Sequence, residues 1–188
     1  MTEHFEAASA HGRFQPIHNG HLEYLLAAKA RCRYLWVGIT AYELDVSRLR
    51  STDRERPENN PLTYFERVRL ITLALLDAGV KGSDFGFLPF PIEAPDKLPN
   101  FLPLRIPCFT TICEPWNREK IGILERIGYK VVVLYERKEK SVTGKMVRNN
   151  IQAGGKEWEV LVPRAVIGEI INLDLARRLR ELGAGHSE

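Results

Sequence analysis

The sequence has 188 residues, of which 44% are hydrophobic and 27% are charged. This length and mixture are typical of a globular chain with one sizeable core, and they exclude disorder through most of its length. The 27 basic and 24 acidic residues give a net charge of +3, which is too balanced to indicate nucleic acid as the main partner.

Cysteine content and hydropathy set the expected compartment. The three cysteines form no CxxC pair, so we expect neither a disulfide framework nor a structural metal site. No signal peptide is visible, and no run approaches the roughly 18 apolar residues of a membrane span. We therefore expect a cytoplasmic protein with no membrane partner, and the sequence leaves a homo-oligomer open.

In the first half of the chain the predicted elements alternate between strand and helix. A strand over 5–10 precedes a helix from 20 to about 32, a strand over 34–40 and a polar, mobile loop over 43–60. A strongly amphipathic helix over 63–77 follows and stops at Gly79. Its apolar residues share one face, which we expect to be buried: Phe65, Val68, Ile71, Leu75 and Leu76.

The second half continues the alternation. A strand over 85–92 leads to an irregular, proline-rich loop over 93–107, a short strand over 109–113 and a helix over 116–127. The run YKVVVLY is the clearest buried strand of the chain, and Thr143 is expected to cap a helix that ends near 153. The last helix is predicted from 163 to 182, with an apolar face formed by Val166, Ile167, Ile170, Ile171, Leu175 and Leu179.

These elements predict an α/β fold: a Rossmann-like five-stranded parallel sheet flanked by helices, with a C-terminal helical segment. We expect one domain over 1–188, with a Rossmann-like core over 1–153 and a C-terminal helix and tail over 154–188. Parallel sheets of this kind bind ligands outside the carboxyl ends of their strands, where the strand order reverses. The loop after the first strand is therefore the first place to look for a site.

That loop reads GRFQPIHNGH over residues 12–21. Gly12 lets a nucleotide approach the backbone, and Gly20 opens a helix whose free N–H groups and positive dipole end suit a phosphate. His18 and His21 can donate hydrogen bonds to phosphate oxygens, and Arg13 adds a fixed positive charge. This combination at a strand-to-helix junction indicates a phosphate-binding site.

The same string resembles the first signature of the nucleotidyltransferase superfamily, in which a His or Thr, a spacer, Gly and His follow the first strand. Within that superfamily, the sequence is most similar to the archaeal-type nicotinamide mononucleotide adenylyltransferases and their near relatives, over nearly the whole chain. The segment Asn60-Pro61-Leu62-Thr63, followed by Glu66, Arg67 and an apolar helix, resembles a family segment at the same place.

The segment TGKMVR over 143–148 resembles the second signature of the family, which is Ser-Gly-Thr, two residues and Arg. Thr143 keeps the hydroxyl, Gly144 keeps the close backbone approach and Arg148 keeps the cation. Lys145 replaces a Thr, and it either adds a phosphate contact or points to solvent. The segment is not a P-loop, because the glycine-rich run that precedes Gly-Lys in that motif is missing.

The resemblance implies transfer of a nucleoside monophosphate from a nucleoside triphosphate to a phosphate-bearing acceptor, with release of pyrophosphate. Because the acceptor oxygen is already an anion, catalysis needs positioning and charge stabilisation rather than a general base. His18, His21 and Arg148 are the implied catalytic residues, and Mg²⁺ is expected to bridge phosphate oxygens without a dedicated protein metal site. The implied nucleotide-binding residues are Gly12, Arg13, Phe14, Gln15, Gly20, Thr143, Gly144 and Lys145.

The acceptor side departs from the pyridine-nucleotide enzymes, which carry a Trp after the third strand that stacks on the pyridine ring. The matching stretch of this chain, residues 92–103, has no Trp. We expect the acceptor to bind residues 93–105, through the aromatic ring of Phe101 and the cations Lys97 and Arg105.

A second departure falls on the same side. Those relatives carry an Arg just before the Pro-Phe/Leu-Thr segment, where this chain has Asn59 and Asn60, and Arg54 or Arg56 is expected to substitute. Two substrate pairs therefore stay open: ATP with nicotinamide mononucleotide, giving NAD, and CTP with a small phosphate or phosphonate acid. A non-catalytic nucleotide sensor on the same fold is the third alternative.

Overall fold

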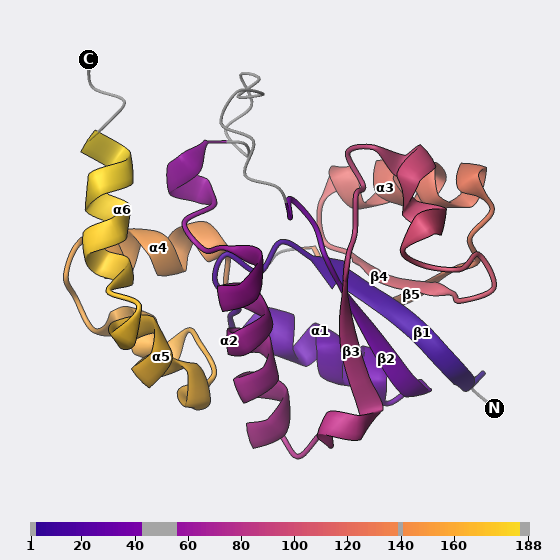
Figure 1. The fold of residues 1–188 in the computed structure, drawn as a ribbon, viewed down its shortest axis with the longest axis horizontal. Coiled ribbons are helices and arrows are strands. Elements are labelled where there is room, and N and C mark those ends of the chain that lie inside the picture. The colour runs from indigo at the N-terminus through magenta and orange to yellow at the C-terminus, as the bar shows by residue number, and fades with distance from the viewer. Residues whose placement is uncertain (1–2, 43–55, 139–140, 185–188) are drawn as a thin grey trace. The chain divides into compact units, whose positions relative to one another are not determined.

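A computed structural model describes residues 3–42, 56–138 and 141–184 (Figure 1). The chain divides into two compact units. The sheet unit comprises Met1–Arg13, Glu23–Tyr42 and Gly79–Ser141, and the helical unit comprises Phe14–Leu22, Glu43–Ala78 and Val142–Glu188. The single domain expected over 1–188 stays a prediction, and the loop predicted over 43–60 lies outside the described residues apart from 56–60.

Five parallel strands form the sheet, in the order β3-β2-β1-β4-β5 (Figure 1). Their bounds are β1 Phe5–Gly12, β2 Cys32–Ile39, β3 Phe85–Pro89, β4 Cys108–Ile112 and β5 Val131–Glu136. The predicted five-stranded parallel sheet is confirmed. Because the chain places β2 and β3 on one side of β1 and then returns to place β4 and β5 on the other, the strand order reverses between β1 and β4.

β5 forms an edge of the sheet, and most of its residues are only partly buried. The prediction that this run is the clearest buried strand is therefore wrong. An edge strand has a neighbouring strand on one side only, so its apolar sequence does not ensure burial. The fully buried strand residues lie in the centre of the sheet, where β1 contributes Ala8 and Ala10 and β2 contributes Leu35 and Val37.

α3, Pro115–Ile127, and a 3-10 helix at Pro95–Asn100 belong to the same unit as the sheet. Leu124 of α3 and Leu98 of the 3-10 helix share one core cluster with strand residues such as Cys108. Gly128 ends α3 in the left-handed conformation, with a φ of 108°. The irregular loop predicted over 93–107 thus contains a helical segment, because Pro95 supplies a backbone suited to a first helical position.

α1, Asn19–Lys29, starts in the helical unit and continues in the sheet unit. It ends at Lys29 rather than near Cys32, because Cys32 is the first residue of β2. The buried residues of α1 are Tyr24, Leu25 and Ala28.

α2, Tyr64–Asp77, begins with the capping box of Thr63 and Glu66, and Gly79 follows it with a φ of 84°. The predicted buried face is wrong in part, because Phe65 is 70% exposed and Leu76 is 47% exposed. Packing against the turn at Arg164–Val166 selects a different face. The buried residues of α2 are Arg67, Leu70, Ile71, Ala74 and Leu75.

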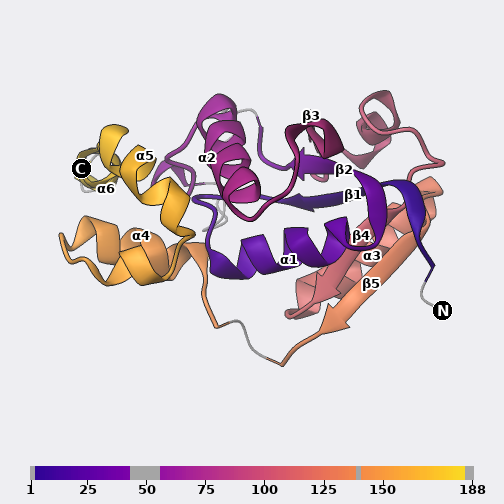
Figure 2. The same ribbon diagram turned by 90° about the horizontal axis from the view of Figure 1, so that it is seen from below.

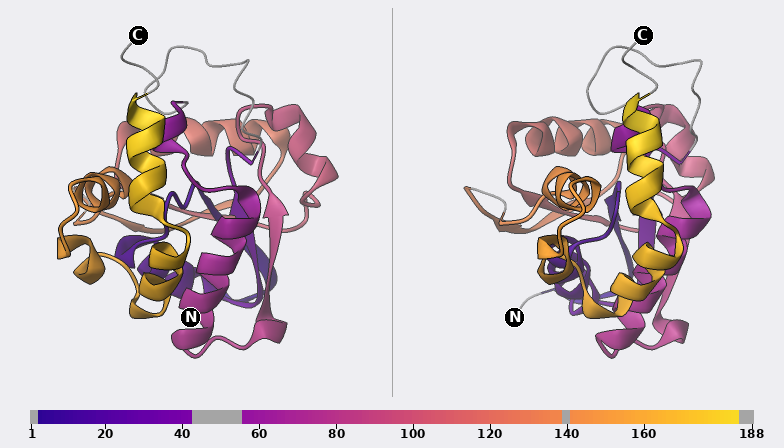
Figure 3. Two further views of the ribbon diagram at one scale, coloured as in Figure 1. Left: turned by 60° about the vertical axis from the view of Figure 1, so that its left-hand side comes forward. Right: turned by 90° about the vertical axis from the view of Figure 1, so that its left-hand side faces the viewer.

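Three C-terminal helices complete the helical unit: α4 Gly144–Gln152, α5 Ile167–Asn172 and α6 Leu175–Ala184 (Figures 2 and 3). The single helix predicted from 163 to 182 is wrong, because Asp174 has a φ of 46° and interrupts the right-handed helix. Ile171, which is predicted to lie on the apolar face, is 60% exposed.

Short 3-10 turns lie at Pro57–Asn59, Gly82–Asp84, Glu157–Val160 and Arg164–Val166. No helix within the described ranges has the length and apolar character needed to cross a membrane.

Candidate active site

His18 and His21 lie together at the start of α1, in the helical unit. Their rings stack with centroids 3.6 Å apart and an interplanar angle of 22°. The ring of Phe14 is fully buried and meets the ring of His21 edge-on, with centroids 4.9 Å apart. Phe14 has a φ of 52°, in the left-handed region, which turns the chain after β1. The two imidazoles, which the sequence predicts to bind phosphate together, are thus held side by side, and the ring of His21 contacts a buried aromatic ring.

A backbone contact fixes the proton of a neutral His18 ring. The N–H of His21 donates to the His18 carbonyl oxygen at 2.8 Å and to Nδ1 of the His18 ring at 3.3 Å. Because Nδ1 accepts this hydrogen bond, a neutral His18 ring carries its proton on Nε2. His18 therefore presents Nε2–H as a donor, which suits a phosphate oxygen.

Several backbone amides at the start of α1 already have partners. The N–H of Asn19 donates to the carbonyl of Leu161 at 2.9 Å, and the N–H groups of His21 and Leu22 donate to the carbonyl of His18 at 2.8 and 3.0 Å. The N–H groups of Asn19, His21 and Leu22 are therefore not among the free amides that the sequence predicts at the start of this helix. The imidazole side chains are the stronger candidates for phosphate contact in this loop.

Arg148 of α4 joins the second motif to the first. It is only 5% exposed, and its Nη1 donates to the carbonyl oxygen of Gln15 at 2.7 Å. Its Nη2 donates to Oδ1 of Asn59. Two contacts from one planar fork fix the plane of the guanidinium. The two motifs that the sequence singled out therefore meet within the helical unit.

Gly144 makes this approach possible. A Cβ at position 144 would lie 3.1 Å from the carbonyl oxygen of Gln15 and 3.1 Å from Nη1 of Arg148. The sequence predicts that a group approaches the backbone closely at Gly144, and in the structure the approaching groups are the Gln15 carbonyl and the Arg148 guanidinium. Thr143 caps α4, because its hydroxyl accepts from the N–H of Met146 at 3.2 Å, and Lys145 is exposed on the first turn.

The side chain of Gln15 attaches the first motif to the segment before α2. Its Nε2 donates to the carbonyl of Leu62 at 2.8 Å, and its Oε1 accepts from the N–H of Leu62 at 2.9 Å. Gln15 and Leu62 are both buried, so the paired bonds satisfy polar groups that water does not reach. Gln15, expected to contact the nucleotide, thus has its side chain engaged by Leu62 and its carbonyl engaged by Arg148.

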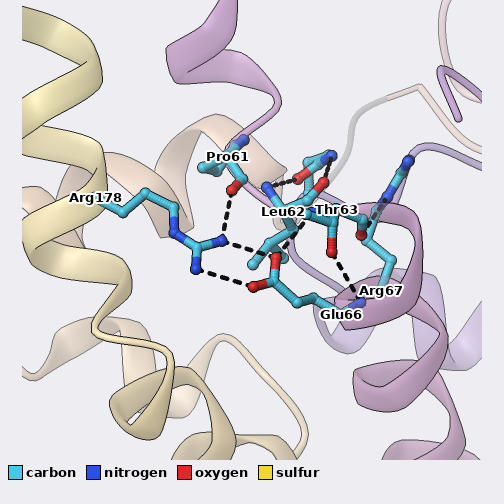
Figure 4. Close-up of polar contacts among 7 residues, drawn as sticks. Pro61, Leu62, Thr63, Glu66, Arg67 and Arg178 are labelled. Atoms are coloured by element: carbon cyan, nitrogen blue, oxygen red, sulfur yellow. Dashed lines mark hydrogen bonds and ion pairs between the residues drawn. The ribbon is translucent and has the colours of Figure 1, made fainter. Parts of the chain in front are cut away.

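Arg178 of α6 holds the same segment from another side (Figure 4). Its guanidinium donates to both carboxylate oxygens of Glu66, at 2.7 and 2.9 Å, and to the carbonyl of Pro61 at 3.0 Å. Glu66 in turn accepts from the N–H of Thr63 at 2.8 Å. Both residues that flank Leu62 are thereby fixed by the Glu66–Arg178 pair.

Burial and hydrogen bonding oppose each other at the Glu66 carboxyl. Desolvation by burial raises its pKa, but the hydrogen bonds from Arg178 and Thr63 and the charge of Arg178 together lower it by more. The net pKa of Glu66 is therefore below its ordinary value, and the pair stays ionised at neutral pH. No local pattern could have revealed Arg178, which lies 112 residues from its partner.

The other predicted nucleotide-binding glycines and Arg13 are divided between the units. Gly12 ends β1 in the sheet unit, where its carbonyl accepts from the N–H of Thr40 at 3.0 Å, and the partly buried Arg13 follows it. Gly20 is in the helical unit, and a Cβ at that position would lie 3.4 Å from the His18 ring.

The predicted acceptor-binding residues lie in the sheet unit, within and just after the 3-10 helix Pro95–Asn100. Phe101 is 37% exposed, and its ring centroid lies 6.1 Å from that of Tyr42. Lys97 and Arg105 are also exposed. Tyr42, which follows β2, is an aromatic neighbour that the sequence argument missed because the two residues come from separate loops.

The helical-unit cluster consists of two imidazoles, a guanidinium and amides, which are the donors that recognise phosphate oxygens. In the part of the chain that the structure describes, no group of three or more His, Cys, Asp or Glu side chains is placed to hold a metal ion.

The fold and the two motifs define a nucleotidyltransferase. A family model described as cytidylyltransferase-like matches residues 9–150, and the chain belongs to that family. One relative is the phosphonoformate cytidylyltransferase of Streptomyces viridochromogenes, 40% identical over 172 residues that cover 90% of this chain and 93% of the relative. Another is the nicotinamide-nucleotide adenylyltransferase of Ignicoccus hospitalis, 29% identical over 176 residues that cover 91% and 94%. The resemblance inferred from the two motifs is confirmed.

The fold recurs in a solved structure of a bifunctional NMN adenylyltransferase/ADP ribose pyrophosphatase from Francisella tularensis, complexed with AMP and a Mn ion. The TM-score is 0.69 at 14% identity, and the match covers 98% of this chain and 52% of that protein. The chain therefore spans about half the length of this structural neighbour. At this identity the likeness concerns the fold alone.

We predict that Gly144→Ala lowers kcat for pyrophosphate release. The added methyl group would press on the Gln15 carbonyl and Nη1 of Arg148, each 3.1 Å from the Cβ position. Small displacements of positioning groups cost about 10- to 100-fold in rate. The matched control is Gly168→Ala in α5, where a Cβ meets nothing within 4 Å. Equal kcat for the two variants would show that the contact beneath Gly144 does not position the site.

We also predict that Arg178→Lys destabilises the chain by about 1 kcal/mol, because a lysine cannot reproduce the two-pronged contact with the partly exposed Glu66. The melting temperature should fall by roughly 2–4 °C for this size of chain. Arg177→Lys is the control, since Arg177 forms exposed pairs with Asp174 and Glu181.

The pH dependence of this difference follows from the Glu66 carboxyl. Since folding lowers its pKa, the stabilisation is complete at pH values well above the ordinary 4.5 and disappears as the pH falls through the lowered value. The difference between Arg178→Lys and wild type should therefore narrow in acid. A difference that is unchanged by acid would contradict this role of the ion pair.

Proposed function

We propose that this chain transfers a cytidylyl group from CTP to a small acid that bears a phosphate or phosphonate group. The observation that carries the proposal is the 40% identity to the phosphonoformate cytidylyltransferase, against 29% to the Ignicoccus adenylyltransferase over a similar share of the chain. The absence of a Trp from residues 93–105 is consistent with an acceptor that has no pyridine ring.

The second candidate is adenylyl transfer from ATP to nicotinamide mononucleotide, which gives NAD. The neighbouring rings of Phe101, which is 37% exposed, and the partly buried Tyr42 favour it, because aromatic rings with accessible surface can stack on a pyridine ring. Under either candidate, Phe101, Lys97 and Arg105 are proposed to contact the acceptor.

In the proposed reaction, an anionic oxygen of the acceptor forms a bond to the α-phosphorus of the triphosphate. The bond from that phosphorus to the bridging oxygen breaks in line, and pyrophosphate leaves with the oxygen and its electron pair. His18, through Nε2–H, and His21 donate to the phosphate oxygens as charge develops on them. Arg148, whose guanidinium is fixed against Gln15, offsets the charge of the departing phosphates.

The remaining predicted residues support the triphosphate. Gly12 and Gly20 allow the triphosphate to approach the backbone, and Gly144 leaves room for the contact between Arg148 and Gln15. Arg13 and Lys145 add positive charge, and Phe14, Gln15 and Thr143 hold the loops that carry these groups. Mg²⁺ would supply further positive charge when bound through phosphate oxygens, which agrees with donors suited to phosphate rather than to a hard cation. The cytoplasmic location and the homo-oligomer stay predictions.

A substrate panel tests the proposal. We expect CTP with phosphonoformate to release pyrophosphate with a kcat/KM well above that of ATP with nicotinamide mononucleotide, when all four triphosphates are combined with each acceptor. Mass spectrometry of the nucleotide product identifies the acceptor group. A preference for ATP with the mononucleotide would replace the first candidate by the second, and nucleotide binding without any turnover would contradict both.

We predict that His18→Ala and His21→Ala each lower kcat by about 10²–10³-fold, with a much smaller effect on KM. The reason is that each ring is proposed to donate a hydrogen bond that strengthens in the transition state. His4→Ala is the control, because His4 is exposed ahead of β1. Turnover near that of wild type in either variant would remove the residue concerned from the mechanism.

A further inference from the structure

His11 of β1 is a buried polar side chain that the proposed reaction does not use. It is 3% exposed, and neither of its ring nitrogens has a hydrogen-bond partner among the described residues. A buried polar group without a partner destabilises a fold, because it has left water and received no bond in return. An apolar side chain would be the more stable choice at this position, so the imidazole needs a functional explanation.

The position of His11 coincides with the point at which two central strands part. β1 and β4 pair at Ser9 with Cys108 and at Ala10 with Phe109. One residue further on, the N–H of His11 donates to the Tyr24 hydroxyl at 3.1 Å, and that hydroxyl donates to the Phe109 carbonyl at 2.7 Å. The Tyr24 hydroxyl thus bridges the two strands. This is also where the strand order reverses, the position at which parallel sheets bind ligands.

The His11 ring is held in one orientation. It stacks flat on the ring of Phe90, with centroids 4.0 Å apart and an interplanar angle of 4°. Gly38 pairs with His11 in the sheet and leaves the room for this stack. A Cβ at Gly38 would lie 3.0 Å from Cβ of His11 and 2.6 Å from a ring carbon of Phe90. A fixed ring with unused polar atoms has the properties of a preorganised binding group.

The electrostatic surroundings of His11 suit a negatively charged ligand. Burial and then the positive charge of Lys120 hold the pKa of His11 well below its ordinary value. The ring is therefore neutral at pH 7 and offers one N–H donor and one acceptor nitrogen. An oxyanion can accept from that N–H and is attracted by the charge of Lys120.

We propose that His11 binds an acid group of the acceptor, a carboxylate or similar oxyanion, at the carboxyl end of β1. This inference rests on the proposed function, and it narrows the class of acceptor. The acceptor then carries two acid groups: the one whose oxygen attacks the α-phosphorus, and a second one that the His11 N–H recognises.

Two acceptors separate these groups experimentally. Phosphonoformate carries a phosphonate and a carboxylate, whereas methylphosphonate carries the phosphonate alone. We expect wild type to prefer phosphonoformate, and His11→Leu to reduce the ratio of the two kcat/KM values by about 10- to 100-fold, the effect of one lost hydrogen bond to a charged group. The KM for CTP should stay within about twofold of wild type, and the melting temperature should not fall, because the nitrogens of His11 have no partner in the described chain to lose.

The control and the second variant guard against a purely structural effect. Ser9→Ala removes another buried polar group of β1, one that is bonded to Pro107 and Cys108, and it should leave the acceptor ratio unchanged. His11→Gln retains a donor and an acceptor, and it should recover part of the ratio.

The outcomes distinguish this inference from the proposed function. If wild type releases no pyrophosphate from CTP with either small acid, the proposed function fails and the assignment of His11 fails with it. If wild type is active and His11→Leu keeps the wild-type ratio, only the assignment of His11 is overturned. If Ser9→Ala lowers the ratio as much as His11→Leu does, the effect is a general loss of packing in β1 and the assignment is again overturned.

Discussion

The helical unit depends on one contact, the hydrogen bond from Nη1 of Arg148 to the carbonyl oxygen of Gln15 at 2.7 Å. It joins residues 133 positions apart and so brings the two motifs into one place. A buried guanidinium is costly unless its charge is matched by well-placed acceptors. The Gln15 carbonyl and the Asn59 side chain provide such acceptors. The contact also explains why position 144 is a glycine, since any side chain there would meet both ends of this bond.

The supporting contacts extend outward from the same loop. The Gln15 side chain bonds both backbone groups of Leu62, and Glu66 and Arg178 hold the residues on either side of Leu62. His18 and His21 are thus carried by a loop whose neighbours are fixed by hydrogen bonds, and those between Gln15 and Leu62 are buried. Catalysis by positioning and charge stabilisation requires this kind of rigidity, because preorganised donors do not have to be reoriented as charge develops. Gln15, His18 and Arg148, which hold this geometry, are among the buried polar residues of the described chain.

The sequence predicted the sheet and both motifs because each has a local signature. The Thr143 cap, the glycine after α2 and the apolar strands could all be identified from a few neighbouring residues. The errors have a common origin in tertiary structure. YKVVVLY is apolar enough for a central strand, yet β5 lies at an edge, and Phe65 fits the helical stripe of α2 but faces outward. Asp174 interrupts the last predicted helix with a left-handed backbone conformation, which the presence of an aspartate does not predict. Arg178 and Glu66 are far apart in the sequence and come into contact only in the folded chain.

The central claim is that the two motifs act as one phosphate site, and hydrogen–deuterium exchange with increasing CTP and Mg²⁺ tests it most directly. The backbone amides of residues 14–22 and 144–152 should become protected together, with the same dependence on CTP concentration, because Arg148 joins the two segments. In an Arg148→Lys variant the two protection curves should separate, since a lysine cannot bond Gln15 and Asn59 with one planar group. Protection of one segment without the other in the wild-type protein would contradict the account.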